Sequence, residues 1–227
     1  MTKFNKYTQY KTVDIKQRDW PNNHLNKCPI WCSVDLRDGN QALAEPMDSV
    51  RKMKFFKKLI DVGYKEIEVG FPSASDTDFN FIRELINDDH IPEDVTIQVL
   101  TQSREELIIK TIDSLKGSKN AIIHLYNSTS TLQRKVVFKE DMNGVKKIAT
   151  DGAKIISDNI GILNNTNVRL EYSPESFTGT ELPYALEVCE EVLDVWEANE
   201  LKPVIINLPA TVEMSSPNIY ADQIEWM

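Results

Sequence analysis

The segment Asp35–Gln41, with the sequence DLRDGNQ, holds the residues whose types and spacing best suit chemistry. The carboxylate of Asp38 is the kind of oxygen ligand that a hard divalent cation prefers. The guanidinium of the adjacent Arg37 suits the stabilisation of negative charge that develops on a carbonyl oxygen. The alternative is an Arg–Asp pair on the surface of a turn in which Gly39 supplies a positive φ. The residues alone leave both interpretations open.

Polar side chains also follow each of five later apolar runs along the chain. They include carboxylates, amides, hydroxyls and one histidine. If the runs are parallel strands, their carboxyl ends meet at one edge of the sheet, which is where α/β barrels hold their active sites. The residues expected there are Arg37, Asp38, Asn40 and Gln41 from the first turn, and Glu68, Leu100, His124, Tyr126, Ser173, Glu175, Asn207, Pro209 and Thr211 from the later strand ends.

The elements that must position these residues alternate between short apolar runs and amphipathic helical stretches. This alternation predicts an α/β protein with a parallel sheet and right-handed crossovers. An open doubly wound sheet and a barrel both fit it. The turn after the first run has one glycine and no G-x-G-x-x-G, so a nucleotide-binding doubly wound fold loses its main support. Since eight barrel units take about 250 residues, the pattern favours an incomplete TIM (β/α)₈ barrel with about six βα units.

The predicted strands cover residues 30–36, 66–69, 95–100, 121–125, 168–172 and 204–208. In the first helix, Asp48 is expected as the N-cap, Gly63 as the end and Val50 on the buried face. Ser103, with Glu106 three residues later, has the signature of a capping box for the third helix. Six units cannot close a barrel, so we expect open strand edges and exposed apolar side chains in the interior.

Composition narrows the class of protein. Hydrophobic residues make up 41% and charged residues 27% of the 227 residues, as in globular proteins. The net charge of −9, without a basic patch, argues against nucleic acid as a partner. No apolar run approaches the length of a membrane span, and the first residues do not resemble a signal peptide. Three cysteines, Cys28, Cys32 and Cys189, form no disulfide framework, and we expect Cys28 and Cys32 to be buried or half-buried thiols in a cytoplasmic protein.

Six segments, in order, resemble the strand-end motifs of the 2-isopropylmalate synthase family: WCSVDLRDGNQAL, YKEIEVGFPSAS, DVTIQVLTQ, HLYNSTS, EYSPESFTGTE and INLPATVEM. The resemblance extends over residues 17–227, and DLRDGNQ is similar to the form found in the longer class of these synthases. It implies a TIM barrel that condenses acetyl-CoA with 3-methyl-2-oxobutanoate and hydrolyses the thioester. The products are 2-isopropylmalate and CoA, in the first step of leucine biosynthesis.

The resemblance also implies roles for individual residues. Asp38 matches the ligand of a divalent metal, which is Mg²⁺, Mn²⁺ or Zn²⁺, and Arg37 matches the arginine that holds the ketoacid oxygen. Glu175 is expected to take part in catalysis. The residues that match the lining of the ketoacid pocket are Leu100, His124, Tyr126, Ser173, Asn207, Pro209 and Thr211.

Structural interpretations stand beside these roles. Glu68 is expected to hold Arg37 in an ion pair, because a buried arginine needs a partner, and Asn40 and Gln41 are expected to support the same turn. His124 also fits a satisfied histidine at a strand end. Glu175 also fits an acid at a helix N-terminus.

The chain departs from the family at its metal site. The family completes that site with a His-x-His pair, whereas the histidines here are His24, His90 and His124. We therefore expect the catalytic domain in this chain to be partial and inactive alone. Residues 1–27 are expected to be an N-terminal extension, and residues 28–227 the partial catalytic domain.

A homodimer is expected for the full-length protein. The alternatives are a related citramalate, homocitrate or methylthioalkylmalate synthase, or a ketoacid-binding module without catalysis.

Overall fold

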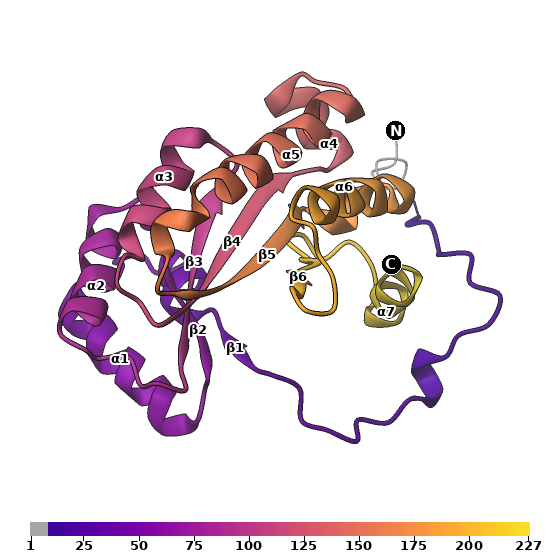
Figure 1. Ribbon diagram of the computed structural model, residues 1–227. Coiled ribbons are helices and arrows are strands. Elements are labelled where there is room, and N and C mark those ends of the chain that lie inside the picture. Colours follow the sequence, from indigo (N-terminus) through magenta and orange to yellow (C-terminus); the bar gives the residue numbers. More distant parts are fainter. Residues whose placement is uncertain (1–8) are drawn as a thin grey trace.

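Six parallel strands in consecutive order form the centre of the protein (Figure 1). The computed structural model describes residues 9–227, so residues 1–8 of the predicted N-terminal extension lie outside the described part. An order without a reversal excludes the doubly wound alternative, in which the strand order turns back at a switch point. The incomplete barrel predicted from the sequence is confirmed. The strands are β1 (Cys32–Ser33), β2 (Glu66–Gly70), β3 (Thr96–Gln102), β4 (Asn120–Ser128), β5 (Asn167–Glu175) and β6 (Val204–Ile206).

Helices connect successive strands and cover the outer face of the sheet, as expected for right-handed βαβ units. The α-helices are α1 (Ser49–Val62), α2 (Asp76–Asn87), α3 (Glu105–Ser114), α4 (Thr131–Gln133), α5 (Met142–Asn159), α6 (Leu182–Val195) and α7 (Pro217–Trp226). Shorter 3-10 turns are η2 (Trp20–Asn22), η5 (Ile160–Leu163) and η6 (Phe177–Gly179), and π-helical turns are η3 (Asp35–Gly39) and η4 (Arg134–Phe138). In the described residues, no helix is both long and apolar enough to cross a membrane.

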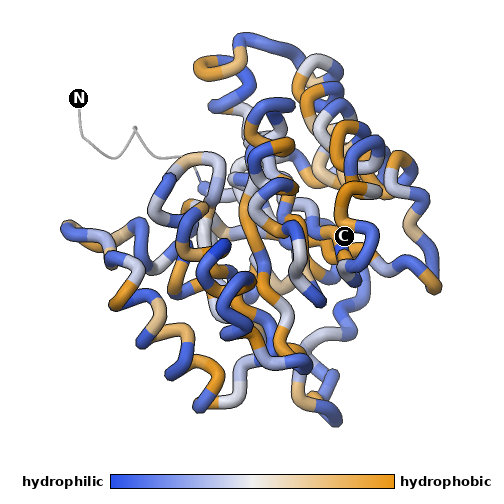
Figure 2. Tube along the Cα trace, turned by 60° about the vertical axis from the view of Figure 1, so that its left-hand side comes forward, coloured by the Kyte–Doolittle hydropathy of each residue, from blue (hydrophilic) through white to orange (hydrophobic). Residues whose placement is uncertain are grey.

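The two faces of the sheet differ in chemistry because successive side chains of a strand point to opposite sides. Outward-facing residues such as Ile67, Val99 and Ile123 belong to the hydrophobic core that the helices share. In the hydropathy colouring, apolar and polar residues alternate along the outer helices, as this packing requires (Figure 2). On the inner face, Glu68 and His124 lie in a buried polar network. The expectation of exposed apolar side chains in the interior is wrong for the central strands. Glu68, Gln98 and His124 lie on their inner face, and the apolar Leu100 and Ile122 beside them are buried.

The first strand is shorter than predicted. Only Cys32 and Ser33 pair with β2, and residues 35–39 wind into the turn η3. The carbonyl of Val34 accepts hydrogen bonds from the amides of Arg37, Asp38 and Gly39, so this backbone is satisfied locally and not by a neighbouring strand. The apolar run before the turn is largely exposed, with Ile30 at 74% and Trp31 at 63%. Cys28 is also exposed, contrary to the expectation, whereas Cys32 is half-buried.

The helix signals were partly correct. Asp48 caps α1 by accepting a hydrogen bond from the Arg51 amide, and Gly63 ends it with φ of 110°. Val50, however, is 65% exposed, because it lies on the solvent side of the first turn. The capping box at Ser103 is also wrong: α3 begins at Glu105, and the Ser103 hydroxyl donates to the Ile148 carbonyl on α5 instead. A tertiary contact thus replaced the local one.

Residues 18–20, in the predicted N-terminal extension, contact α7. The described part of the extension runs from β1 around to the last helix (Figure 1), where the guanidinium of Arg18 donates to both carboxylate oxygens of Asp222. The backbone amides of Asp19 and Trp20 donate to Glu225. These bonds join segments about 200 positions apart in the sequence and fix α7 beside the open side of the sheet.

Candidate active site

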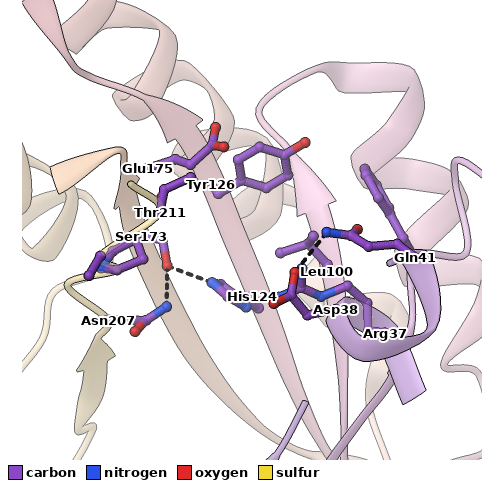
Figure 3. Close-up of a pocket in the computed structure, with 13 residues that line it drawn as sticks. Arg37, Asp38, Gln41, Leu100, His124, Tyr126, Ser173, Glu175, Asn207 and Thr211 are labelled. Atoms are coloured by element: carbon purple, nitrogen blue, oxygen red, sulfur yellow. Dashed lines mark hydrogen bonds and ion pairs between the residues drawn. The ribbon is translucent and has the colours of Figure 1, made fainter. Parts of the chain in front are cut away.

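A cavity of about 600 Å³ lies at the carboxyl ends of the strands. That volume is within the range of small-molecule sites. The structure brings into its wall every predicted site residue except Glu68 and Asn40 (Figure 3). The lining residues are Arg37, Asp38, Gln41, Phe71, Leu100, His124, Tyr126, Ser173, Glu175, Asn207, Pro209, Ala210 and Thr211.

The turn η3 positions Arg37 and Asp38 at the cavity. The Arg37 Nε donates to Glu68, whose side chain is completely buried. The Nη1 atom donates to Asp38 Oδ1 at 2.9 Å, and Gln41 Nε2 donates to the same oxygen at 2.7 Å. Among the described residues, the three remaining guanidinium hydrogens have no acceptor. They are free to bind oxygens of a molecule in the cavity.

Gln41 and Asn40 differ from each other in role. Gln41 was expected to support the turn, yet it lines the cavity and also orients Asp38. Asn40 is buried and lies outside the lining. Its side-chain oxygen accepts a hydrogen bond from the Met47 amide at 2.7 Å, which ties the turn to the segment before α1.

Beneath the cavity floor, Glu68 is the centre of a buried network. It accepts hydrogen bonds from Arg37, from Gln98 Nε2 at 2.7 Å and from His124 Nδ1 at 2.7 Å. Burial raises the pKa of Glu68, but the hydrogen bond and charge of His124 and the charge of Arg37 lower it by more, to about 2. The ion pair predicted between Glu68 and Arg37 is therefore present, and the carboxylate stays ionised at neutral pH.

His124 links this network to the cavity. Its Nε2 lies 2.7 Å from Ser173 Oγ and 3.4 Å from Glu171 Oε1. Burial lowers the pKa of His124, but the hydrogen bond and charge of Glu68, together with the charge of Glu171, raise it by more, so that the net shift is upward. His124 is thus both a satisfied histidine at a strand end and a wall of the cavity.

Glu171 is the residue whose environment the sequence did not reveal. Its place within the predicted strand 168–172 indicates a structural role. Its side chain is buried next to His124, and burial raises its pKa to about 7, with the charge of His124 opposing this shift. Only the pairing of β4 with β5, which sets His124 opposite Glu171, brings the two groups together.

The remaining polar groups come from β5 and the segment after β6. Asn207 Nδ2 donates to Ser173 Oγ at 2.8 Å. Thr211 Oγ1 accepts a hydrogen bond from the Ser176 amide at 3.1 Å, which joins the loops after β5 and β6. Ser128 donates to Glu175 Oε2, and the other carboxylate oxygen has no hydrogen-bond partner among residues 9–227, so it is left for a ligand.

Apolar side chains form another part of the wall. Leu100, Pro209 and Phe71 line the cavity, and the Phe71 ring meets the Tyr126 ring edge-on with centroids 6.1 Å apart. Phe71 was missed as a site residue, although its place directly after a predicted strand was a usable signal. Ala210 was also missed, and its side chain carries no chemical signal.

The described residues do not fit a complete metal site. A catalytic divalent cation takes about three ligands from the protein. No three His, Cys, Asp or Glu side chains gather as a metal site within residues 9–227. Asp38 offers a carboxylate at the cavity mouth, but one of its oxygens already accepts from Arg37 and Gln41. The metal role of Asp38 stays a prediction, and no catalytic step is derived through a cation.

These features define a class of protein: a parallel β/α barrel with a cavity at the carboxyl ends of its strands. The cavity wall has polar and apolar side chains, which suits a small oxygen-rich molecule. The chain belongs to the HMGL-like family, whose profile matches residues 28–227. Among curated relatives, it is 63% identical to a 2-isopropylmalate synthase of Parafrankia sp. over 98% of this chain and 40% of that protein. It is 59% identical to a 2-isopropylmalate synthase of Clostridium acetobutylicum, with the same two coverages. The chain thus spans about 40% of the length of these relatives.

Solved structures agree on the fold. The HMG-CoA lyase of Brucella melitensis matches 86% of this chain and 65% of its own length with a TM-score of 0.60 and 14% identity. The HMG-CoA lyase of Bacillus subtilis matches 87% of this chain and 63% of its own length, with a TM-score of 0.59 and 15% identity. At these identities the likeness concerns the fold alone.

Proposed function

We propose that the protein acts as a 2-isopropylmalate synthase, and that its cavity binds the 2-oxo acid that is condensed with acetyl-CoA, 3-methyl-2-oxobutanoate. The observation that carries the proposal is Arg37, which is fixed by buried Glu68 and keeps three hydrogen-bond donors for a ligand beside an apolar wall. Relatives with this name are 56–63% identical over nearly the whole chain, which supports the same reaction.

The oxygen end of the 2-oxo acid binds at Arg37. A guanidinium donates two parallel hydrogen bonds to a planar pair of oxygens, such as the keto and carboxylate oxygens of a 2-oxo acid. When the acetyl carbon attacks the keto carbon, negative charge collects on the keto oxygen. The fixed positive charge of Arg37 stabilises it without reorganisation, because Glu68 already holds the side chain in place.

The branched end of the acid binds against Leu100, Phe71 and Pro209. This wall favours an isopropyl group over the shorter side chain of pyruvate, since two fewer buried carbons weaken binding by about tenfold or more. It also disfavours 2-oxoglutarate. Arg37 is the one Lys or Arg among the described residues of the cavity lining. The second carboxylate of 2-oxoglutarate would therefore lie near the negative charge of Glu175 without a cationic partner. This charge pattern favours the isopropylmalate reaction over the citramalate and homocitrate reactions.

Glu175 and Asp38 have supporting roles in the proposal. The free carboxylate oxygen of Glu175 accepts a proton or a hydrogen bond from water in the cavity, as needed for thioester hydrolysis. Asp38 orients Arg37 and is the ligand that these residues offer to a divalent cation. A homodimer and a cytoplasmic location stay expectations from the family resemblance.

Calorimetric titration of the 227-residue chain with 3-methyl-2-oxobutanoate tests the proposal. We expect saturable binding with one site, weaker binding of pyruvate by about tenfold, and still weaker binding of 2-oxoglutarate. Arg37→Gln should weaken binding by about 100-fold, because a charged bidentate contact is lost. Arg51→Gln, at an exposed site on α1, is the matched control and should bind as the wild type does.

The outcomes separate the alternatives. Preference for pyruvate would favour a citramalate synthase, and preference for 2-oxoglutarate would favour a homocitrate synthase. Binding without release of thiol from acetyl-CoA by the full-length protein would favour a ketoacid-binding module. No binding of any 2-oxo acid, or equal binding by Arg37→Gln, would reject the proposed site.

A further inference from the structure

Lys52 on α1 is a lysine whose side chain is completely buried. Its ammonium donates to Asp78 Oδ1 on α2 and lies 5.6 Å from the centre of the Phe81 ring. Among the described residues, Asp78 is the one hydrogen-bond partner of this ammonium. Apolar residues of similar size often replace a buried ion pair without loss of stability. The buried charge of Lys52 therefore points to a role besides stability.

Asp78 connects this lysine to the end of β2. While Oδ1 accepts from Lys52, Oδ2 accepts a hydrogen bond from the Phe71 amide at 2.8 Å. The backbone amide of Asp78 donates to Ser75 Oγ at 3.2 Å, in the N-cap of α2. Because one carboxylate oxygen is bound to Lys52, the other is fixed in the direction of Phe71. The ion pair thus ties α1 and α2 to the backbone of Phe71.

The strand β2 is irregular just before Phe71. Its register against β3 shifts between Glu68 and Gly70, as at a β-bulge. Val69 faces the core that the helices share, and a Cβ at Gly70 would lie 2.9 Å from the Asp78 carboxylate, so two successive positions face outward. Regular alternation would place Phe71 on the outer face with Val69, whereas its side chain lines the cavity. A bulge beside a functional site commonly redirects a side chain in this way.

The place of Phe71 in the cavity wall depends on Asp78. Phe71 follows the last paired residue of β2, and its amide donates to the Asp78 carboxylate. Its carbonyl accepts from the Ala74 amide at 3.0 Å, within the turn before α2. The Phe71 ring in turn meets the Tyr126 ring edge-on. A displacement of the Asp78 carboxylate is therefore transmitted to two rings of the wall.

We propose that Lys52 and Asp78 are positioning residues for substrate selectivity: they hold Phe71 against the carbon chain of the 2-oxo acid, so that a branched chain binds better than a short one. The inference rests on the proposed function, since it concerns the ligand of the same cavity. Neither Lys52 nor Asp78 lines the cavity, so both act through Phe71. Arg37, which binds the oxygen end, is held separately by Glu68. Selectivity and overall affinity therefore depend on different contacts.

The ratio of two dissociation constants tests the inference: Kd for pyruvate divided by Kd for 3-methyl-2-oxobutanoate, measured by titration calorimetry on the 227-residue chain. The wild type should give a ratio of about ten. Asp78→Asn should lower it to about three, because one amide oxygen cannot accept from both Lys52 and Phe71, and the Phe71 contact is lost while Leu100 and Pro209 stay in place. A loss of stability alone would weaken both ligands by the same factor and leave the ratio unchanged.

Gly70→Ala is a second variant that keeps both charges of the pair. The added methyl group would displace the Asp78 carboxylate, so the ratio should again fall to about three. This variant decides the question if Asp78→Asn does not fold. In Phe71→Ala the ratio should already be low, and adding Asp78→Asn should lower it no further, because both changes remove the same contact.

Glu66→Gln is the matched control. Glu66 lies at the opposite end of β2 from Phe71, its carboxylate is about as buried as that of Asp78, and it accepts a hydrogen bond from Arg169. This variant should keep the wild-type ratio.

The outcomes separate this inference from the proposed function. Saturable binding with the wild-type ratio in Asp78→Asn or Gly70→Ala would overturn the inference and leave the proposed function standing. An equal fall in Glu66→Gln, or a further fall when Asp78→Asn is added to Phe71→Ala, would overturn it as well. Absence of binding of both acids by the wild type would overturn the inference and the proposed function together.

Discussion

Replacing Glu68 by glutamine removes one negative charge from the centre of the site with almost no change in shape. Three donors converge on the wild-type carboxylate: Arg37 Nε on one oxygen, and Gln98 Nε2 and His124 Nδ1 on the other. An amide has one accepting oxygen and one donating nitrogen. In either orientation of the new side-chain amide, at least one donor of the network would face another donor at hydrogen-bond distance.

The cost follows from the pKa of Glu68. The drop from 4.5 to about 2 means that the folded protein stabilises the charged carboxylate by about 3 kcal/mol, at about 1.36 kcal/mol per unit. Since the folded pKa is the lower one, this contribution is fully present above pH 4.5 and is lost as the pH falls to about 2. Glu68→Gln should therefore lower the free energy of unfolding by about 3 kcal/mol at pH 7, within the range for breaking buried ion pairs.

Urea denaturation at several pH values measures this difference. At pH 7 the variant should also melt about 6–12 °C below the wild type, given the usual scaling for this chain length. The difference in free energy of unfolding between wild type and variant should shrink as the pH falls from 4.5 to 2. Glu187→Gln, which removes a half-exposed partner of Lys146 on the surface, is the control and should cost less than about 1 kcal/mol. The reasoning would be refuted if Glu68→Gln lowered the free energy of unfolding at pH 7 by less than about 1 kcal/mol. It would also be refuted if the difference from the wild type stayed constant with pH.

Three further predictions concern other parts of the molecule. Gly63→Ala should destabilise by about 1 kcal/mol or more in thermal or urea melts, because the residue ends α1 with φ of 110°. Gly152→Ala should cost about 1–3 kcal/mol, since a Cβ on α5 would lie 2.9 Å from the Ser103 Cβ, and adding Ser103→Gly should recover part of the loss in a double-mutant cycle. In an EPR titration, Mn²⁺ should bind the 227-residue chain with a Kd above about 0.1 mM, because no other described His, Cys, Asp or Glu side chains join Asp38 in a metal site. A lower Kd would contradict this reasoning.

Much of the architecture was readable from local patterns. Alternation of apolar runs with amphipathic stretches predicted the parallel sheet, because each element must bury one face. The ends of α1 followed from Asp48 and Gly63, whose chemistry acts within a few residues. Most of the cavity wall was also predictable, since residues just after parallel strands share one edge of the sheet.

Features that depend on distant segments were not predictable. The turn η3 forms where the end of a strand was predicted, because the Val34 carbonyl accepts hydrogen bonds from amides within the turn. The Ser103 hydroxyl was expected to cap α3, but it donates to the Ile148 carbonyl on α5. The pKa of Glu171 is raised mainly by burial, which only the folded sheet provides, and the charge of His124 opposes this shift.

The amino-acid sequence by itself determined which side chains reach the strand ends, since that follows from strand order and a period of two. Only the tertiary structure decided how they are paired: the charge of Glu68 is shared among groups from three other elements, and Ser173 lies between His124 and Asn207. Strand register and side-chain packing set these short distances, and neither is encoded within any single stretch of the chain.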